Sequence, residues 1–345
     1  MTVPSLQPVR STRPRSSRRA LAALVAVLAL GLTAVVAPVG AQTAPSTASG
    51  TASGWLASQL VDGQRLETTF DGTSFPDYGL TADAVLAFAA AGVADPQAAA
   101  ATSWLVANAA AYVGDGTDAV FAGSTAKLAL VAQVRGLDPR AVGGADLVAR
   151  LLDREQADGR FTDLSEFGDF SNPITQSLAI LVLARQPGVS PSDAAIDRLL
   201  AVRCADGGIA SSLDADPATC TSGVDGTAFA VQALIAAGRP GDAATIAGAL
   251  DFLEAAQQAG GGLGTTADAA PNANSTGVAA QALAAGGRGA AASAAQGFLV
   301  SLQQGCDADA ADRGAIAFDA TGFEPSNAAR ATTQAILGLA GQPFG

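Results

Sequence analysis

The stretch Gly136-Leu137-Asp138-Pro139 is one copy of a turn that recurs between apolar, alanine-rich runs. Related turns occur at residues 92–96, 188–191 and 238–240, and in weaker form at Gly287 and Gly341. The glycines of successive copies are separated by 44, 52, 50, 49 and 54 residues. A period of this length is typical of repeats in which each unit buries its apolar face only by stacking on its neighbours. The sequence therefore predicts six helical hairpins, each with one inner and one outer helix.

A second series runs out of phase with these turns. Each outer run carries an apolar pair on its first turn, at Trp55-Leu56, Trp104-Leu105, Leu151-Leu152, Leu199-Leu200, Phe252-Leu253 and Phe298-Leu299. Asp-Gly follows seven and eight residues later at Asp62-Gly63, Asp158-Gly159 and Asp206-Gly207, and the fifth copy keeps Gly260. A glycine at this place fits a helix C-terminus that needs a left-handed residue, so we interpret these glycines as helix stops.

The ends of the repeat array indicate a ring. Open solenoids need polar terminal repeats, whereas the last run, residues 335–340, is as apolar as the middle ones and the first begins with Trp55. We therefore expect the helix at residues 81–91 to pack against the helix at residues 328–340.

Three segments in the loops resemble a known family. Residues 154–161, 203–209 and 257–264 are similar to the Gln-x-x-Asp-Gly-Gly-aromatic repeats of the terpenoid cyclase and protein prenyltransferase superfamily, also called prenyltransferase and squalene oxidase repeats. The resemblance covers about residues 54–342. It implies an all-α fold, an α/α toroid of six inner and six outer helices around a central cavity.

The catalytic motifs of that superfamily are missing from this chain. Cyclases of the squalene-hopene type protonate an alkene with an Asp-x-Asp-Asp motif, and neither residues 307–312 nor residues 214–217 contain its adjacent aspartates. The zinc site of the prenyltransferases needs a histidine, and the chain has none. The Cys-Gly-Glu-Gln of thioester domains does not occur, and aromatic residues, which stabilise carbocations, make up only 5% of the chain.

The N-terminal segment has the pattern of an export signal. Five arginines precede an uncharged run at residues 20–37, and Val39-Gly40-Ala41 supplies small residues for cleavage near Ala41. Ser17-Arg18-Arg19 faintly resembles a twin-arginine signal, and the uncharged run is also just long enough to remain as a membrane anchor. We expect residues 1–41 to be the signal, residues 42–53 a flexible Ser/Thr-rich linker and residues 54–345 the toroid domain of a secreted or envelope-associated protein.

Charge excludes nucleic acid as a partner. Removal of residues 1–41 leaves 14 basic and 31 acidic side chains, a net charge of −17, with no basic stripe. The apolar fraction of 49% supports one globular unit, and we expect a monomer without a cofactor.

The three cysteines suit an oxidising compartment. Cys204 and Cys220 lie close in the sequence and are expected to form a disulfide, which leaves Cys306 unpaired. Asp307, Asp309 and Asp312 are a weak candidate for calcium, with a solvated acidic loop as the alternative.

Polar residues precede the inner runs. Asn172, Asp225, Asn274 and Asn327 each stand before an alanine-rich segment, and a glutamine follows the last three after seven residues, at Gln232, Gln281 and Gln334. The conservative interpretation is N-capping, since Asn and Asp accept hydrogen bonds from free N–H groups of the first helical turn. Six parallel helix starts would also form a polar rim above an apolar barrel, which suits a small-molecule site. The rim candidates are Tyr78, Asp83, Asn172, Gln176, Asp225, Asn274, Asn327 and Arg330.

These observations favour a non-catalytic module that binds a small molecule, isoprenoid- or cobalamin-like, in or over the toroid cavity. The alternatives are a divergent terpenoid cyclase or prenyltransferase-like enzyme, and a scaffold or adhesion module of the cell envelope. A buried carboxyl with a raised pKa in the cavity would favour the enzyme, and a filled core without a pocket would favour the scaffold.

Overall fold

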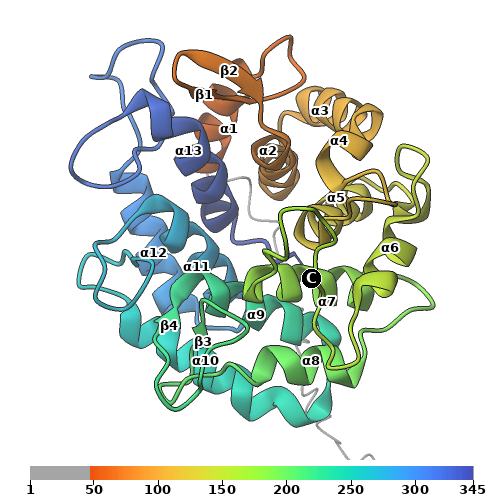
Figure 1. Cartoon of the computed structure of the whole chain (residues 1–345). Helices are drawn as coiled ribbons and strands as arrows, with labels where there is room; N and C mark the ends of the chain where they lie inside the picture. The colour runs from red at the N-terminus through yellow and green to blue at the C-terminus, as the bar shows by residue number, and fades with distance from the viewer. Residues whose placement is uncertain (1–46, 345) are drawn as a thin grey trace, which may run out of the picture. The chain divides into compact units, whose positions relative to one another are not determined.

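The computed structural model describes residues 47–344, which form an all-α ring (Figure 1). The inner helices are α2 (Tyr78–Ala91), α5 (Ala122–Val134), α7 (Pro173–Arg185), α9 (Val224–Ala237), α11 (Ala273–Ala285) and α13 (Pro325–Ala340). The outer layer contains α1 (Thr47–Ser58), α3 (Asp95–Ala107) with the short α4 (Ala109–Val113), α6 (Leu147–Arg154), α8 (Asp193–Leu200), α10 (Ala243–Ala256) and α12 (Gly289–Ser301). Every inner helix follows an outer one, so the six inner helices run in the same direction. The predicted α/α toroid is confirmed.

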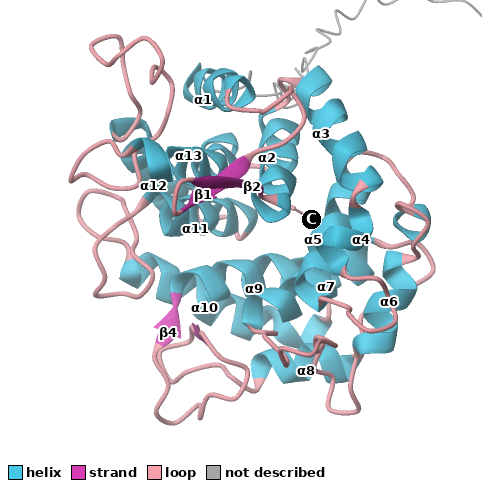
Figure 2. Cartoon of the chain, turned by 45° about the horizontal axis from the view of Figure 1, so that its top comes forward, coloured by secondary structure: helices cyan, strands magenta, loops and turns pink. Residues whose placement is uncertain are grey.

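Short strands lie in the loops between the helices (Figure 2). β1 (Glu67–Phe70) and β2 (Thr73–Pro76) form an antiparallel hairpin in which Glu67 faces Pro76. β3 (Ile209–Ala210) pairs with β4 (Ser222–Gly223) inside the loop that precedes α9. Two 3₁₀ turns, Pro139–Ala141 and Pro240–Asp242, follow two of the predicted glycine turns. None of the helices between residues 47 and 344 is both long and apolar enough to span a membrane.

Packing between α13 and α2 closes the ring. The inner helices contact one another in the order α2, α5, α7, α9, α11, α13 and back to α2, and α1 packs on both α13 and α2. Polar contacts reinforce the junction: the Trp55 indole N–H donates to the Ala311 carbonyl at 2.9 Å, and Gln303 Nε2 donates to the Ala48 carbonyl at 2.9 Å. The predicted closed ring is therefore confirmed.

The inner helices are buried on nearly all sides. In α7 the four consecutive residues Ile180, Leu181, Val182 and Leu183 are each at most 1% exposed. A helix that is apolar all round is stable only inside a protein core. Here the outer helices cover one side of it and the ring interior the other, which explains why these runs contain so few charges.

The turn glycines and the loop glycines have different roles. Gly92, Gly238 and Gly341 end α2, α9 and α13 in the left-handed conformation, with φ of 67°, 64° and 61°. Gly159 and Gly207 instead lie beyond the ends of their helices. A Cβ on Gly159 would lie 2.1 Å from the Ala194 backbone of α8, the next outer helix.

This close approach recurs at later copies around the ring and replaces the helix-stop interpretation there, whereas Gly63 in the first copy has open space around it. A Cβ added at three further loop glycines would also meet the backbone of the next outer helix. Gly207 faces Gly248 of α10, Gly261 faces Ala294 of α12, and Gly314 faces Thr51 of α1. The fifth copy is therefore Gly261 rather than the predicted Gly260, which has open space around it. The repeat keeps a glycine because a loop must touch a neighbouring helix backbone.

The linker prediction is wrong from Thr47 onward. Residues 47–53 belong to α1, and Ser49, Ala52 and Ser53 are buried there. Small side chains let α1 approach α13 closely, so a composition that is typical of a tether serves here as a packing face. The toroid domain thus begins before residue 54. The predicted export signal, residues 1–41, lies outside the described residues.

One disulfide joins Cys204 to Cys220, as predicted, with the two Cα atoms 5.6 Å apart. Cys306 is exposed and free. The bridge closes a loop that carries β3 and ends two residues before β4, directly ahead of the N-terminus of α9.

Candidate functional site

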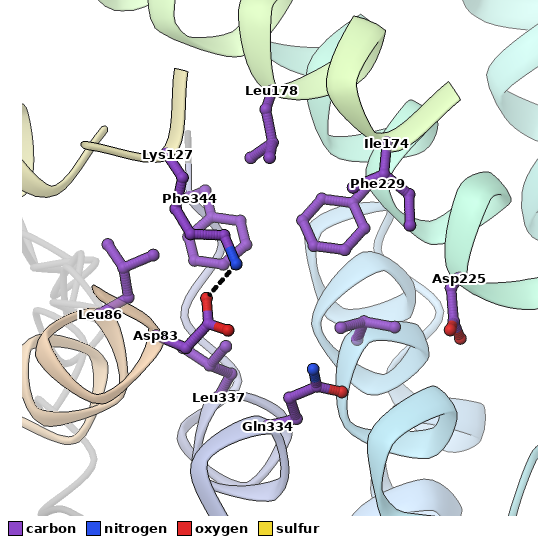
Figure 3. A pocket seen from close by; sticks show the side chains of 11 residues that line it. Asp83, Leu86, Lys127, Ile174, Leu178, Asp225, Phe229, Gln334, Leu337 and Phe344 are labelled. Carbon is purple, nitrogen blue, oxygen red and sulfur yellow. Dashed lines mark ion pairs between the residues drawn. The ribbon is translucent and has the colours of Figure 1, made fainter. Parts of the chain in front are cut away.

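A cavity of about 150 Å³ lies in the middle of the ring, and all six inner helices line it (Figure 3). Its apolar wall is made by Leu86, Ile174, Leu178, Phe229, Val278, Leu337 and Phe344. Its polar groups are Asp83, Lys127, Asp225 and Gln334. The cavity therefore combines an apolar body with few polar side chains, which is the usual composition of a small-molecule site.

An ion pair spans two of the inner helices at the cavity wall. Lys127 Nζ of α5 lies 2.7 Å from Asp83 Oδ1 of α2. Burial alone would lower the pKa of Lys127, but the Asp83 carboxylate and the Tyr112 phenol raise it by more, so the amine stays protonated. Burial is also the main reason why the pKa of Tyr112 is raised to about 12. The pair is internally neutralised and holds α2 against α5.

Asp225 differs from Asp83 in having no cation beside it. It is the second residue of α9, and within residues 47–344 it forms no ion pair, while its buried Oδ1 has no hydrogen-bond partner. Burial raises the pKa of Asp225, and a hydrogen bond from the Ser275 hydroxyl partly opposes that rise. A buried acceptor without a partner costs about 1–3 kcal/mol, so this carboxyl is destabilising as it stands.

The C-terminal tail closes the far end of the cavity. Gln232 Oε1 of α9 accepts the Phe344 amide N–H at 3.1 Å, and Gln281 Nε2 of α11 donates to the Gln342 carbonyl at 2.6 Å. Arg185, at the end of α7, donates to the Phe344 carbonyl. The Phe344 ring is 6% exposed and stacks on Phe229 with ring centroids 6.1 Å apart. Three inner helices thus hold the tail across their C-terminal halves.

Solved structures of low sequence identity share this architecture. A type II terpene cyclase from Scytonema in complex with the substrate geranylgeranyl dihydroxybenzoate matches with a TM-score of 0.64 and 15% identity, over 87% of this chain and 97% of that one. The chain has the α/α-toroid fold of the terpenoid cyclases. No family model matches the sequence, and no curated protein does.

The same toroid occurs in proteins with different chemistry. An unsaturated glucuronyl hydrolase specific for heparin matches with a TM-score of 0.61 and 15% identity, over 85% of this chain and 95% of that one. An ent-copalyl diphosphate synthase from Streptomyces platensis matches with a TM-score of 0.53 and 20% identity, over 79% of this chain and 53% of that one. A toroid alone therefore does not fix the reaction, and function has to be argued from the cavity.

Two of the predicted rim residues, Asp83 and Asp225, line the toroid cavity. Tyr78 stacks instead between Trp104 and Tyr112, with ring centroids 5.0 Å and 5.9 Å away, and lines a separate open groove beside the β1–β2 hairpin. The sequence analysis thus identified the two carboxyl groups that line the toroid cavity but not the other lining residues.

Gln176 and Asn172 have structural roles. Gln176 is fully buried, accepts the Phe161 N–H and donates to the carbonyls of Gly159 and Ala195, so it fastens the Gly159 loop to α8. Gln176 does not line the toroid cavity, although the sequence analysis placed it among the rim residues. Asn172 caps α7 by accepting the N–H groups of Ile174 and Thr175 at 2.9 Å and 3.1 Å, as the conservative interpretation predicted.

The other three polar candidates lie inside α11 and α13. Asn272, not Asn274, caps α11, since its Oδ1 accepts the Ser275 N–H at 2.9 Å. Asn274 therefore lies two residues inside the helix, where its buried Oδ1 has no partner. Asn327 and Arg330 are exposed on α13, and Arg330 pairs with Asp77 at 3.0 Å across the ring closure. None of the three lines the toroid cavity.

The calcium candidate is wrong. Within residues 47–344 no three acidic, histidine or cysteine side chains are grouped closely enough to hold a metal ion. Asp309 accepts the Asp312 N–H through its backbone carbonyl at 2.9 Å, so Asp307, Asp309 and Asp312 belong to a solvated loop turn.

Sequence reasoning missed Lys127, Phe229, Gln334 and Phe344. A signal existed for two of them. Lys127 is the only lysine in the chain and stands in an otherwise apolar run. Gln334 belongs to the series of glutamines seven residues after a polar position, which is two helical turns and hence the same helix face.

Proposed function

We propose that this protein is an exported module that binds a small molecule in the toroid cavity and catalyses no reaction on it. The observation that carries the proposal is the cavity itself, with seven apolar and four polar lining residues contributed by all inner helices and the tail. Dry cavities of about 150 Å³ hold a molecule of the size of benzene. The ligand that fits inside is therefore small, and a long isoprenoid or a corrinoid would have to lie over the rim.

An enzyme is the second candidate, because Asp225 is a cavity carboxyl whose pKa is raised by burial. Acid catalysis on an alkene, however, needs a carboxyl that gives its proton up readily. No cation of the described residues pairs with Asp225, so little stabilises the anion that proton transfer to an alkene would leave behind. Within residues 47–344, only two aromatic side chains, Phe229 and Phe344, line the cavity and could stabilise a developing carbocation. These features support binding over catalysis. A scaffold would need only a filled core, so the cavity also favours binding over a scaffold role.

The unique lysine provides a direct test of the binding proposal. Because Lys127 lines the cavity and no second lysine exists, reductive methylation labels one internal site in addition to the chain's α-amine. Phenethyl alcohol, toluene and geraniol would first be screened for shifts in melting temperature. A ligand in the cavity should slow the labelling of Lys127, measured by peptide mass mapping, while labelling of the α-amine serves as the internal control.

A cavity-filling variant makes the test specific. Leu178 is 4% exposed and points into the cavity from α7, so Leu178→Phe should occupy the space without introducing a polar group. The variant should fold, and protection of Lys127 by the probes should disappear. If none of the probes stabilises the wild-type protein or protects Lys127, the binding proposal is wrong. Conversion of geraniol or another probe into a new product by the wild-type protein, lost in Asp225→Asn, would support the enzyme instead.

A further inference from the structure

The polar groups of the cavity restrict the class of ligand beyond its size. Resting on the proposed function, we infer that the cavity selects a small apolar amine, whose protonated head contacts Asp225 and whose body packs against Phe229 and Phe344. Three independent features of the cavity carry this inference: an acid without a base, an aromatic pair next to it, and an excess of negative charge.

The first feature is the imbalance between the two cavity acids. Asp83 already has Lys127 at 2.7 Å, and its charge is neutralised. Asp225 has no ion-pair partner within residues 47–344, and its Oδ1 is buried without a hydrogen bond. A ligand with an N–H group would supply what this oxygen lacks, and an ammonium would supply the missing charge as well. A ligand carboxylate or phosphate would add a like charge beside it.

The second feature is the aromatic pair. Phe229 lies four residues after Asp225 in α9, and residues at this spacing share a helix face. Its ring stacks on Phe344 with an interplanar angle of 15°, and both rings line the cavity (Figure 3). Aromatic faces attract ammonium groups electrostatically, most strongly where water is excluded. A carboxyl with the Phe229 ring one turn away, and the Phe344 ring stacked on Phe229, is thus a site for a cation with an apolar body.

The third feature is the surrounding charge. Among the described residues, Lys127 is the only cationic side chain that lines the cavity, and its charge is neutralised by Asp83. Asp225, when ionised, is then the one unbalanced charge of that lining. The whole chain has a formal net charge of −12. The field of the protein therefore favours the entry of a cation over that of an anion of the same size.

Matched probes separate amine recognition from simple filling of the cavity. Phenethylamine and phenethyl alcohol have the same ring and the same chain length and differ in the head group. Isothermal titration calorimetry on the intact chain at neutral pH would measure both. A charge-assisted hydrogen bond in place of a neutral one should make the amine bind about tenfold more tightly.

Two variants locate that preference. Asp225→Asn should reduce amine affinity to the level of the alcohol and leave the alcohol unchanged. Asp153→Asn removes an exposed acid of the outer helix α6, outside the cavity lining, and should behave as the wild type, which controls for net charge. Circular dichroism and the melting temperature would show that both variants are folded. Equal affinities for the two probes in the wild type, or an equal loss of both in Asp225→Asn, would overturn the inference while the proposed function stands. If neither probe nor toluene binds the wild type, the proposed function fails and the inference fails with it.

Discussion

The crossing of α11 and α13 allows a sharp test of how the ring is packed. A Cβ on Gly277 of α11 would lie 2.3 Å from the Gln334 carbonyl oxygen, more than 1 Å inside ordinary contact. The opposing atom is backbone, so no side chain can turn away, and the two inner helices would have to separate. Overpacking of this kind costs about 3 kcal/mol at the upper end of its usual range. Gly277→Ala should therefore destabilise the protein, although alanine favours a helix over glycine by about 1 kcal/mol.

Gly297→Ala is the matched control, because Gly297 lies inside α12, is exposed and has open space where the Cβ would go. It should stabilise the protein by about 1 kcal/mol. The gain in helix propensity is common to both variants, so the difference between their free energies of unfolding isolates the packing cost. Urea denaturation followed by circular dichroism would measure it. Equal stabilisation by the two substitutions would show that α11 and α13 do not approach one another as described.

Three further predictions concern the site and its supports. Asp225→Asn should stabilise the protein at neutral pH and have no effect in acid, because burial raises the pKa of Asp225 in the folded state, so the stability of the wild type falls as pH rises from the unfolded-state pKa to the folded-state pKa. Melting temperatures of both proteins over a pH series would measure this, and a difference that does not change with pH would contradict the prediction. Gln232→Ala and Gln281→Ala each remove a hydrogen bond to the C-terminal tail, so each should lower the free energy of unfolding by about 1 kcal/mol and speed digestion of the tail by carboxypeptidase. Unchanged digestion would show that these two hydrogen bonds do not hold the tail. Asn172→Ala should lower the free energy of unfolding by about 1 kcal/mol because it removes the cap of α7, whereas Asn327→Ala, at an exposed position, should change it very little. Equal losses of stability in thermal melts would contradict the capping role of Asn172.

The fold followed from the sequence because its determinants are local and repeated. Apolar runs of helical length, proline turns and spaced glycines recur with one period, and a hairpin that cannot bury its own face must stack on copies of itself. The small residues at 47–53 are the exception, because local pattern could not identify them as part of a helix. Their partner α13 is remote in the sequence, and they form a packing face only because the ring closes.

The site was only half predictable for a related reason. Asp83 and Asp225 stood out as charges at the starts of apolar runs, but which side chains face the interior depends on how all six helices are rotated. Phe344 joins the site only because Gln232 and Arg185 fix the tail beneath it, contacts between segments far apart in the chain. The cap of α11 was misplaced by two residues, because Asn272 and Asn274 are equally good capping residues by type.

Closure of α13 onto α2 and α1 constrains how this protein can change over evolutionary time. An open solenoid can gain or lose a unit at either end and remain much the same elsewhere. In a ring, one hairpin more or fewer would alter the diameter, and with it the distance from Asp225 and Lys127 to everything they face. A change in the number of hairpins would therefore rebuild the whole cavity, whereas a substitution in a loop or at a single lining residue leaves the ring intact.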